Sequence, residues 1–381
     1  MSKSGTRAAN GMGTIRRRSD GRWEGRYTGA DGRQHSVYGK TQKATAEALR
    51  AATHSVDAGS WLQPSNMTMD QWFDVWLRDY QAHTTGRTVS TYTAVVRKHM
   101  RPLFGAVRVS ALSQIHVRRM VGDMSRAGLA PATIRHALAI LSASMRCAAE
   151  AGLRSDNPAE GIKAPRPVKS EFTVIDRDMF PAFIAAANQT DVGLALVFLL
   201  LTGLRAGELR ALRWADVDLD AGQMRVERQL RQVNASDRRI GPPKDGSTRT
   251  VYLTPPAVAL LRQQRKDQAT ARLAAAEWIE DDVTRELIFR DARGWNLTDR
   301  ALYNAVKSVQ TALGLPNLRV HDLRHSYAVA ALRAGTDVKT VQHNLGHKHA
   351  SITLDIYAAY TDDAGRTAAA RLADYWTDAT K

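Results

Sequence analysis

The sequence is poor in cysteine and in long hydrophobic runs, and both shortages narrow the class of protein. Its one cysteine, Cys147, excludes an intramolecular disulfide framework and a cysteine-rich zinc site. The longest apolar run, residues 192–201, is about half as long as a membrane-spanning helix needs to be. The N-terminus is polar and basic and lacks the apolar segment of a signal peptide. We therefore expect a cytoplasmic protein that does not enter a membrane.

Two widespread catalytic signatures are missing as well. The segment GPPKDGS at residues 241–247 lacks the spacing of a phosphate-binding P-loop, so an ATP-driven mechanism has no support. The sequence also has no GxSxG turn of the kind that presents a serine nucleophile. Neither chemistry is expected of this chain.

Acidic residues are scarce relative to basic ones, and the imbalance indicates a polyanionic partner. Arginine and lysine number 54 against 38 aspartate and glutamate, which gives a net charge of +16. Residues 1–60 hold 11 basic and 5 acidic residues, residues 61–171 hold 15 and 8, and the remaining 210 residues hold 28 and 25. Nucleic acid fits this excess, because phosphate neutralisation dominates its binding. An anionic membrane surface is the alternative, but we find no basic amphipathic helix suited to it.

The length and the order of patterns predict a multidomain, mainly α protein with small β-sheets. Residues 1–62 hold strand-like segments separated by Asp-Gly turns, followed by a helical segment at 41–58, which predicts a three-stranded sheet with one helix. Residues 65–157 show helical spacing and predict a bundle of four or five helices, the second ending near Pro102. Residues 158–171 contain prolines and basic residues and indicate a linker.

Residues 172–381 predict a mixed, mostly helical domain. A nearly all-apolar segment at 192–201 predicts a buried helix. Alternating residues at 223–230 and 248–253 predict a small antiparallel sheet, with a turn near residues 244–247.

Basic side chains cluster in both N-terminal domains, where they are candidates for DNA contacts. In the predicted sheet they accompany Trp23 and Tyr27, and we predict that a basic, aromatic face binds DNA. The alternative is that Trp23 and Tyr27 form the core of this small domain and that the arginines are a solvated face. The candidates are Arg16, Arg17, Arg18, Arg22 and Arg26 in the sheet, and Arg97, Lys98, Arg118 and Arg119 in the bundle.

The segment from His321 to Tyr360 carries the densest set of chemically active side chains. It begins HDLRH, so that on a helix His321, Arg324 and His325 lie on one face. Arginine is permanently charged and offers a planar fork of donors to a phosphate, and histidine titrates near neutrality. Tyr357 is a candidate nucleophile that needs electrostatic help, since a tyrosine pKa is ordinarily about 10. This pattern indicates phosphoryl transfer as the candidate chemistry.

Two residues outside this segment extend the candidate site. Arg205 ends the predicted buried helix, where an arginine is costly unless an anion meets it. Glu208, three residues later, is the alternative partner for it. Lys244 is a lone lysine among arginines, and a lysine can give up a proton to a leaving oxygen, unlike arginine. A solvated turn lysine is the alternative.

The two histidines of HDLRH also match the spacing of a metal-binding pair. The zinc signature has glutamate where this sequence has Asp322, and Arg324 on the same face would repel a dication. We therefore expect no metal and no other cofactor.

Five motifs, TGLRAGEL, PPKDGSTRTVYL, HDLRHSYA, LGH and SITLDIYAAY, follow one another in this order. They resemble those of the tyrosine recombinases, and specifically of phage-type integrases. The resemblance implies a catalytic domain at 172–381, preceded by a linker at 158–171. Residues 65–157 are similar to the core-site DNA-binding domain of that family, and residues 1–62 to its arm-type DNA-binding domain.

The resemblance also implies a role for each matched residue at the phosphate. Tyr357 would attack the scissile phosphate and form a 3′-phosphotyrosyl link. Arg205 and Arg324 would hold the non-bridging oxygens and stabilise the charge of the transition state. His347 would donate a hydrogen bond to the same phosphate, and His321 would assist proton transfer from the tyrosine.

Three further residues support these groups in the family. Lys244 would protonate the departing 5′ oxygen, Glu208 would support Arg205, and His325 would lie behind the reacting groups. The bond energy stays in the protein–DNA link, so the reaction would need neither ATP nor metal. On a straight helix His347 and Tyr357 would lie about 280° apart, so we expect the chain to turn between them.

The resemblance further implies a homotetramer on double-stranded DNA that binds core and arm sites. It would integrate a mobile element such as a prophage, and excise it with a recombination directionality factor. A conjugative-element integrase and a dimer resolvase are alternatives with the same chemistry, although the basic N-terminal module argues against the resolvase. A DNA-binding regulator without catalysis and a metallohydrolase are alternatives of other classes.

Overall fold

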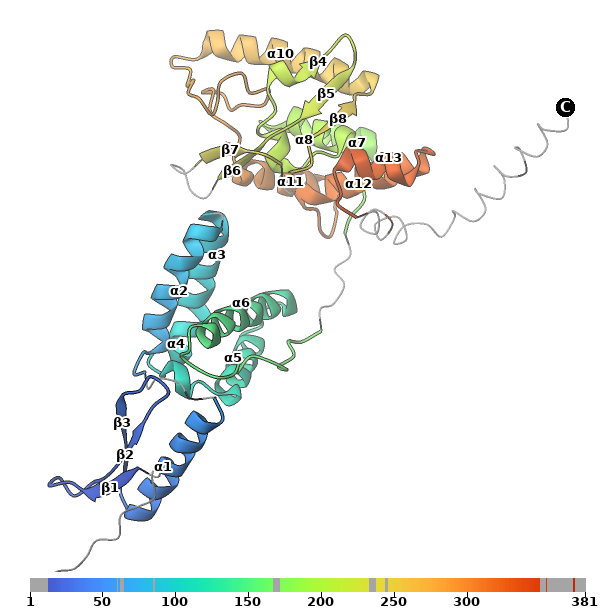
Figure 1. The fold of residues 1–381 in the computed structure, drawn as a ribbon. Coiled ribbons are helices and arrows are strands. Elements are labelled where there is room, and N and C mark those ends of the chain that lie inside the picture. The colour runs from blue at the N-terminus through green and yellow to red at the C-terminus, as the bar shows by residue number, and fades with distance from the viewer. Residues whose placement is uncertain are drawn as a thin grey trace, which may run out of the picture. The chain divides into compact units, whose positions relative to one another are not determined.

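The chain forms two compact units that divide between Lys169 and Ser170 (Figure 1). This computed structural model describes residues 13–59, 61, 65–84, 86–166, 172–232, 238–243, 246–349, 354 and 373. Among these residues, no helix combines the length and the apolar character required to cross a membrane.

The first unit begins with a three-stranded antiparallel sheet and one helix, as predicted. The strands lie in the order β1–β2–β3. They are β1 (Thr14–Arg17), β2 (Trp23–Thr28) and β3 (Gln34–Gly39), and the helix that packs on them is α1 (Gln42–Asp57). The Thr41 hydroxyl accepts a hydrogen bond from the Ala44 backbone N–H and so caps the first turn of α1.

The two aromatic residues of this sheet do not share a surface with the arginines on its open side. Side chains alternate between the faces of a strand, and Gly25 faces Leu49 of α1, so Trp23 and Tyr27 lie on the helix side. Tyr27 is buried, and its hydroxyl accepts a hydrogen bond from Trp61 Nε1 at 3.2 Å. The prediction of a joint basic and aromatic face was therefore wrong for this pair, because the small domain needs them to cover α1.

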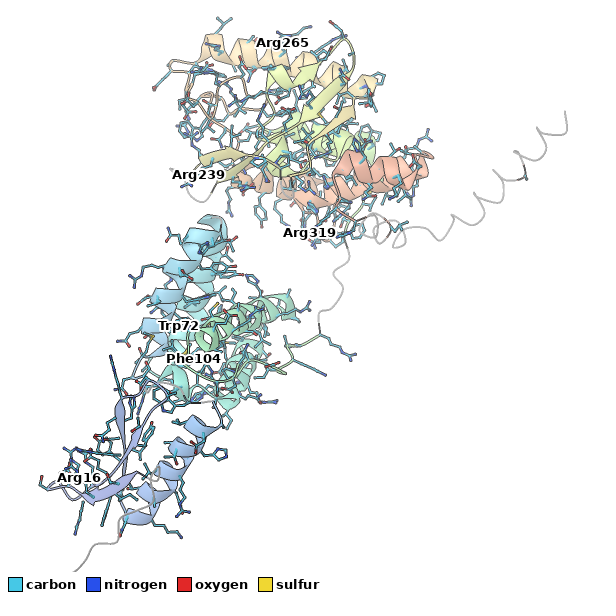
Figure 2. The ribbon with its side chains drawn as sticks, viewed as in Figure 1. Arg16, Trp72, Phe104, Arg239, Arg265 and Arg319 are labelled. Atoms are coloured by element: carbon cyan, nitrogen blue, oxygen red, sulfur yellow. The ribbon has the colours of Figure 1, made fainter. Side chains whose placement is uncertain are left out.

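The rest of the first unit is a helical bundle. Its elements are α2 (Met69–His83), α3 (Gly86–Val95), the π-helical turn η1 (Val96–Met100), α4 (Arg101–Phe104), the 3₁₀ turn η2 (Val109–Ala111), α5 (Gln114–Arg126) and α6 (Pro131–Glu150). Trp72 and Phe104 belong to its core (Figure 2). The buried Trp72 indole donates to Ser144 Oγ at 3.0 Å, so its polar atom is satisfied.

The second predicted helix of the bundle continues past Pro102 instead of ending there. The Arg101 backbone N–H donates to the Val96 carbonyl, five residues earlier. Pro102 then occupies the first turn of α4, where a missing N–H is tolerated. The wider π turn thus accommodates the proline, and the chain remains helical to Phe104.

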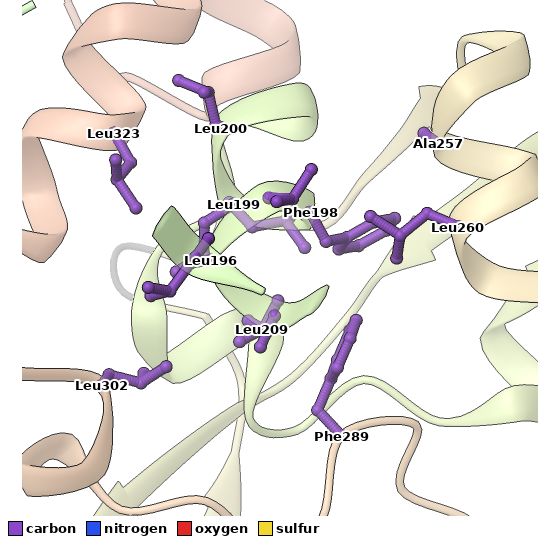
Figure 3. Close-up of a cluster of buried hydrophobic side chains, with 14 of the residues drawn as sticks. Leu196, Phe198, Leu199, Leu200, Leu209, Ala257, Leu260, Phe289, Leu302 and Leu323 are labelled. Atoms are coloured by element: carbon purple, nitrogen blue, oxygen red, sulfur yellow. The ribbon is translucent and has the colours of Figure 1, made fainter. Parts of the chain in front are cut away.

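The second unit is built around the buried helix α8. Its helices are α7 (Phe180–Ala187), α8 (Gly193–Thr202), α9 (Ala206–Leu209), the 3₁₀ turn η3 (Trp214–Asp216), α10 (Pro255–Ala274), α11 (Asp299–Ala312), α12 (Val320–Arg333) and α13 (Val338–Leu345). Leu196, Phe198 and Leu199 of α8 meet side chains from α9, α10, α11 and α12 in one core (Figure 3). The all-apolar sequence of α8 is explained by these contacts on several sides.

The predicted antiparallel pairing of the segments at 223–230 and 248–253 is confirmed for residues 223–226, which pair with residues 249–252, but the remainder of the first segment lies in a second sheet. The alternating segment at 223–230 forms parts of two strands that belong to different sheets. One sheet has the order β4–β5–β8 and the other pairs β6 with β7. The strands are β4 (Val217–Asp218), β5 (Gln223–Val226), β6 (Gln229–Gln232), β7 (Arg238–Gly241) and β8 (Arg249–Tyr252). The period-2 pattern indicated strands, but nothing in it marked the change of partner after Val226.

Candidate active site

The first turn of α12 sets the positions of three candidate residues. Asp322 is buried and accepts a hydrogen bond from the Arg319 backbone N–H at 2.9 Å, so the helix start is capped. As predicted, the helix then carries His321, Arg324 and His325 on one face. The rings of His321 and His325 meet edge to face, with their centroids 4.7 Å apart.

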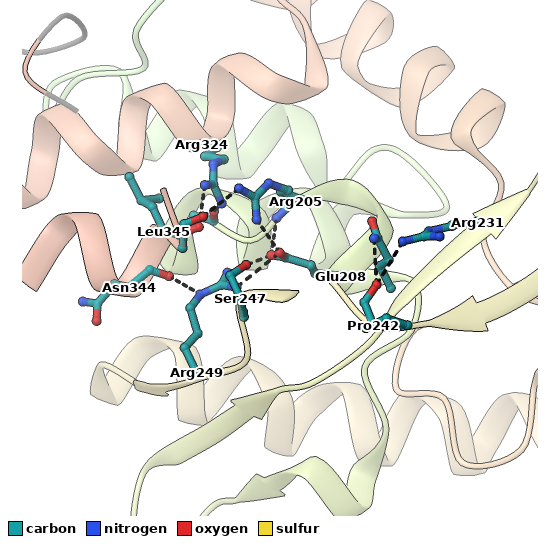
Figure 4. Close-up of polar contacts among 12 residues, drawn as sticks. Arg205, Glu208, Arg231, Pro242, Ser247, Arg249, Arg324, Asn344 and Leu345 are labelled. Carbon is teal, nitrogen blue, oxygen red and sulfur yellow. Dashed lines mark hydrogen bonds and ion pairs between the residues drawn. The ribbon is translucent and has the colours of Figure 1, made fainter. Parts of the chain in front are cut away.

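Arg324 is a buried cation held by backbone carbonyls. It is 2% exposed, and its Nη1 and Nη2 donate to the carbonyls of Gly203 at 2.8 Å and Leu345 at 2.5 Å (Figure 4). These carbonyls end α8 and α13, where unpaired carbonyls and the helix dipole favour a cation. Burial, followed by the charge of Arg205, lowers the Arg324 pKa to about 9. The residue therefore remains a cation at neutral pH.

Two glycines create these carbonyl positions. Gly203 and Gly346 follow α8 and α13 with φ values of 67° and 63°, in the left-handed region. A Cβ on Gly203 would lie 2.5 Å from the Tyr327 ring and 2.7 Å from Leu345. Position 203 therefore requires glycine for its backbone conformation and for lack of space. The glycines of TGLR and LGH thus help to place the carbonyls that bind Arg324.

Arg205 lies beside Arg324 and faces two acceptors. Its Nη1 donates to Glu208 Oε1 at 2.8 Å and its Nη2 to the Gly346 carbonyl at 2.9 Å. Of the two partners considered for Arg205, an external anion and Glu208, the structure shows Glu208 as the local partner. The Arg205 side chain remains partly exposed, which leaves room for an anion as well. Arg205 and Arg324 are thus held next to each other by separate acceptors from α8, α9 and α13.

A third arginine, Arg249, supports this pair. It was not identified from the sequence as a site residue. Its Nη1 and Nη2 contact Glu208 Oε1 and Oε2 at 3.2 and 2.8 Å, and its Nε donates to the Asn344 carbonyl at 2.6 Å (Figure 4). The available signal was the alternation of TRTVYL, which places Arg249 on the same face as the buried Val251. An inward arginine on a strand indicates a buried anion.

The Glu208 carboxylate is fully enclosed by these cations. Burial by itself would raise its pKa, but the hydrogen bonds and charge of Arg249, together with Arg205, bring the pKa below its ordinary value. Glu208 therefore stays ionised and fixes both guanidinium groups.

His321 and His347 stand near the two arginines as neutral groups. Desolvation is the largest cause that lowers the pKa of both imidazoles, and the nearby cations and histidines lower it further. The His321 pKa falls to about 4 and the His347 pKa to about 3. His347 lies two residues after the end of α13, and its backbone N–H donates to the Gln342 carbonyl at 3.1 Å. Neutral imidazoles can donate a hydrogen bond or exchange a proton without adding charge.

His325 lies one turn after His321 on the same helix. Its ring also contacts Phe172, with the centroids 4.7 Å apart. Its buried Nδ1 has no hydrogen-bond partner among the described residues. Desolvation lowers the His325 pKa below its ordinary value, so this imidazole too is neutral at pH 7.

A groove opens beside the site and is rich in cationic side chains. It has a volume of about 460 Å³. Its lining includes the cations Arg249, Lys339 and Lys348 and the neutral imidazole of His347. An anionic polymer that reaches Arg205 and Arg324 would find further positive charge along this groove.

Two of the predicted catalytic residues, Lys244 and Tyr357, lie outside the described residues, as does the second tyrosine, Tyr360. The described part of the chain contains no group of three or more His, Cys, Asp or Glu side chains that could hold a metal ion.

The candidate DNA-binding residues of the first unit lie at its surface. In the helical bundle Arg97 and Lys98 are exposed on η1, and Arg118 and Arg119 are exposed on α5. In the sheet Arg16, Arg17, Arg18 and Arg22 are exposed, and Arg26 is partly exposed. Arg17 lies on the helix side of the sheet by its pairing with Trp23, whereas Arg16 and Arg26 lie on the open side.

The described residues of the site can bind and polarise a phosphate. Two adjacent guanidinium groups present fixed donors to anionic oxygens, and neutral histidines stand beside them. Because the donors are already held by carbonyls and by Glu208, they need little reorganisation when charge develops.

Comparisons with known proteins agree with this chemistry. A model of the "Phage integrase family" matches residues 173–363, and a model of the "Phage integrase, N-terminal SAM-like domain" matches residues 68–125. A tyrosine recombinase XerC-like protein of Caldanaerobacter subterraneus subsp. tengcongensis is 24% identical over 84% of this chain and 86% of its own. A putative prophage phiRv2 integrase of Mycobacterium tuberculosis is 26% identical over 93% of each chain.

Solved structures of low sequence identity share the fold. The Tn1549 transposon integrase in complex with a circular intermediate DNA has a TM-score of 0.69 at 19% identity, and the match covers 80% of this chain and 99% of that one. A lambda integrase tetramer bound to a Holliday junction has a TM-score of 0.59 at 16% identity, covering 92% and 96%. With the family model spanning half of the sequence, the chain belongs to the phage integrase family of tyrosine recombinases.

Proposed function

We propose that this member of the family is a site-specific integrase that cleaves DNA with Tyr357 and rejoins it through a 3′-phosphotyrosyl intermediate. The observation that carries the proposal is the pair Arg205 and Arg324, held side by side by the carbonyls of Gly203, Leu345 and Gly346. Such a pair matches the two non-bridging oxygens of a phosphodiester.

Each step of the reaction has a candidate residue. The Tyr357 oxygen attacks phosphorus, with His321 assisting removal of the phenolic proton. The 5′ oxygen departs as the new bond forms, and Lys244 supplies its proton. His347 and the two arginines stabilise the pentacoordinate transition state. A 5′ hydroxyl from a second strand can reverse the sequence, so the phosphodiester is conserved and no ATP is consumed.

The charge of the first unit supports duplex DNA as the substrate. Residues 1–171 hold most of the net charge of +16. We assign residues 65–157 to the core site, through Arg97, Lys98, Arg118 and Arg119, and residues 1–62 to arm sites. The relatives named prophage and transposon integrases support integration of a mobile element.

The assembly that we propose is a homotetramer on two DNA sites, with a directionality factor joining for excision. The lambda integrase tetramer on a Holliday junction supports this by similarity of fold. Mixing tagged and untagged protein with DNA tests the stoichiometry, and a dimer as the largest catalytically competent species would contradict it.

Covalent attachment tests the central chemistry. A duplex that carries the element's attachment core and a nick beside the cleavage point is incubated with the protein in EDTA. We expect a protein–DNA adduct that resists denaturant, that Tyr360→Phe retains and that Tyr357→Phe abolishes. An adduct in Tyr357→Phe, or activity that requires a divalent metal, would contradict the proposal.

Deletion of residues 1–60 tests the domain assignment separately. The shortened chain should still form the adduct on the core duplex, because the catalytic and core-binding parts remain. It should lose integration into a substrate with arm sites. Undiminished integration would contradict the arm-site assignment and leave the phosphotyrosyl chemistry in place.

A further inference from the structure

The open face of the N-terminal sheet has an acidic residue at its centre. Glu24 of β2 pairs in register with Arg16 of β1 and Tyr38 of β3, and Arg26 pairs with Ser36. Strand alternation places all five side chains on the face away from α1. Glu24 is only 2% exposed. On a surface that only collects phosphates, a carboxylate would weaken binding, so its presence calls for another explanation.

The Glu24 carboxylate holds each of the two arginines by its Nε atom. Its Oε2 accepts from Arg16 Nε at 2.6 Å, and its Oε1 accepts from Arg26 Nε at 3.3 Å. The Ser36 hydroxyl donates to Oε1 at 2.9 Å, so one carboxylate links the three strands. The hydrogen bond from Arg16 is the largest influence that keeps the Glu24 pKa at about 2. The carboxylate is therefore ionised throughout the working pH range.

The outer ends of the two arginines remain available to a ligand. Among the described residues, neither Arg16 nor Arg26 makes a hydrogen bond through its Nη atoms, and the side chains are 58% and 38% exposed. A guanidinium fixed at Nε presents Nη1 and Nη2 with reduced freedom. Such a pair matches the O6 and N7 acceptors of guanine in the major groove, where a β-ribbon can enter.

The residues beside this pair suit the sugar–phosphate backbone. Arg18 and Arg22 extend from the β1–β2 turn, where their guanidinium groups lie 5.7 and 6.0 Å from the Tyr38 ring centroid. Both are exposed, and both pair with Asp20 in the same turn. The sheet thus combines a central arginine pair held by Glu24 with outer cations held by Asp20 in the turn, as expected where bases are read in the centre and phosphates are held at the rim.

We propose that this face reads DNA sequence, with Glu24 as the positioning residue that presents Arg16 and Arg26 to guanine edges. The inference rests on the proposed arm-site binding by residues 1–62 and adds to it the residues that select the site. It makes a prediction opposite to that of simple electrostatics. Removing the negative charge of Glu24 should weaken selective binding, although it makes the face more positive.

The test compares binding of two labelled duplexes by the full chain. The first is a duplex that the wild type selects from a random pool and that the chain lacking residues 1–60 does not select, and the second is its scrambled counterpart. Glu24→Gln should weaken binding to the selected duplex about tenfold or more, the size expected for loss of a two-point contact to guanine. Binding to the scrambled duplex should be unchanged or tighter. Glu47→Gln, an exposed change on α1, is the matched control and should alter neither.

A second variant guards against a change in folding. Arg16→Lys with Arg26→Lys keeps the charge but removes the planar forks, so it should also lose selectivity while retaining general affinity. Equal or tighter binding of the selected duplex by Glu24→Gln would overturn the inference. If no selected sequence depends on residues 1–60, the arm-site proposal itself fails, and the phosphotyrosyl adduct remains the test of the catalytic proposal.

Discussion

Arg249 binds both carboxylate oxygens of Glu208, with nitrogen–oxygen distances of 3.2 and 2.8 Å. Because both groups are buried, removing one leaves the other as an incompletely compensated charge. We expect Arg249→Ala to lower the free energy of unfolding by about 3 kcal/mol and to slow DNA cleavage, since Glu208 also holds Arg205. Urea unfolding and adduct formation measure the two effects. Arg225→Ala, on the neighbouring strand with an exposed ion pair, is the control, and an equally small loss in both variants would contradict the account.

The left-handed glycine after α8 offers a second test. Gly203→Ala should be destabilised both by its φ of 67° and by the contact of 2.5 Å that a Cβ would make with the Tyr327 ring. Gly314→Ala is matched to it, because Gly314 has a φ of 62° but open space around its Cβ position. The control should lose about 1–2 kcal/mol from conformation alone, and Gly203→Ala should lose more and also cleave more slowly. Equal losses in the two variants, with normal cleavage by Gly203→Ala, would contradict the account. They would show that Arg324 functions even when the Gly203 carbonyl is displaced.

The depressed histidine pKa values predict how stability changes with pH. His347 has a pKa of about 3 in the folded protein, below its ordinary value of 6.5, so the unfolded state binds more protons between these values. The contribution to stability is complete above pH 6.5 and is lost as the pH falls toward 3. His347→Gln should therefore flatten the loss of stability between pH 6.5 and 4, measured by thermal unfolding. The exposed His343→Gln serves as the control, and an unchanged pH dependence in His347→Gln would contradict the prediction.

The proposed role of Lys244 can be separated from simple charge. Lys244→Ala should cleave an ordinary phosphodiester slowly, because the departing 5′ oxygen receives no proton. A substrate with sulfur in place of that 5′ oxygen should restore the rate, since a thiolate leaves without protonation. Lys266→Ala, on α10, should behave as wild type on both substrates. A Lys244→Ala defect of equal size on both substrates would contradict the general-acid role.

Local motifs predicted the elements and the positions of the described site residues on them, whereas contacts across the fold were not predictable. HDLRH fixed one helical face, and TGLRAGEL placed Arg205 at the end of a buried helix. The two acceptor carbonyls of Arg324 come from residues 121 and 21 positions away in the chain, and no local pattern reveals such a distance. The partner exchange between β5 and β6 and the role of Arg249 have the same cause, since both depend on tertiary packing.

The most direct measurement of the central claim is the identity of the amino acid joined to DNA. The adduct formed in EDTA is digested with trypsin, which releases residues 349–366 as one peptide that contains both Tyr357 and Tyr360. Fragmentation of this peptide locates the nucleotide, and end-labelling of the released strand identifies its terminus. We expect the modification on Tyr357 and a free 5′ hydroxyl on the departing strand. A nucleotide on Tyr360, or a protein link to a 5′ phosphate, would contradict the account.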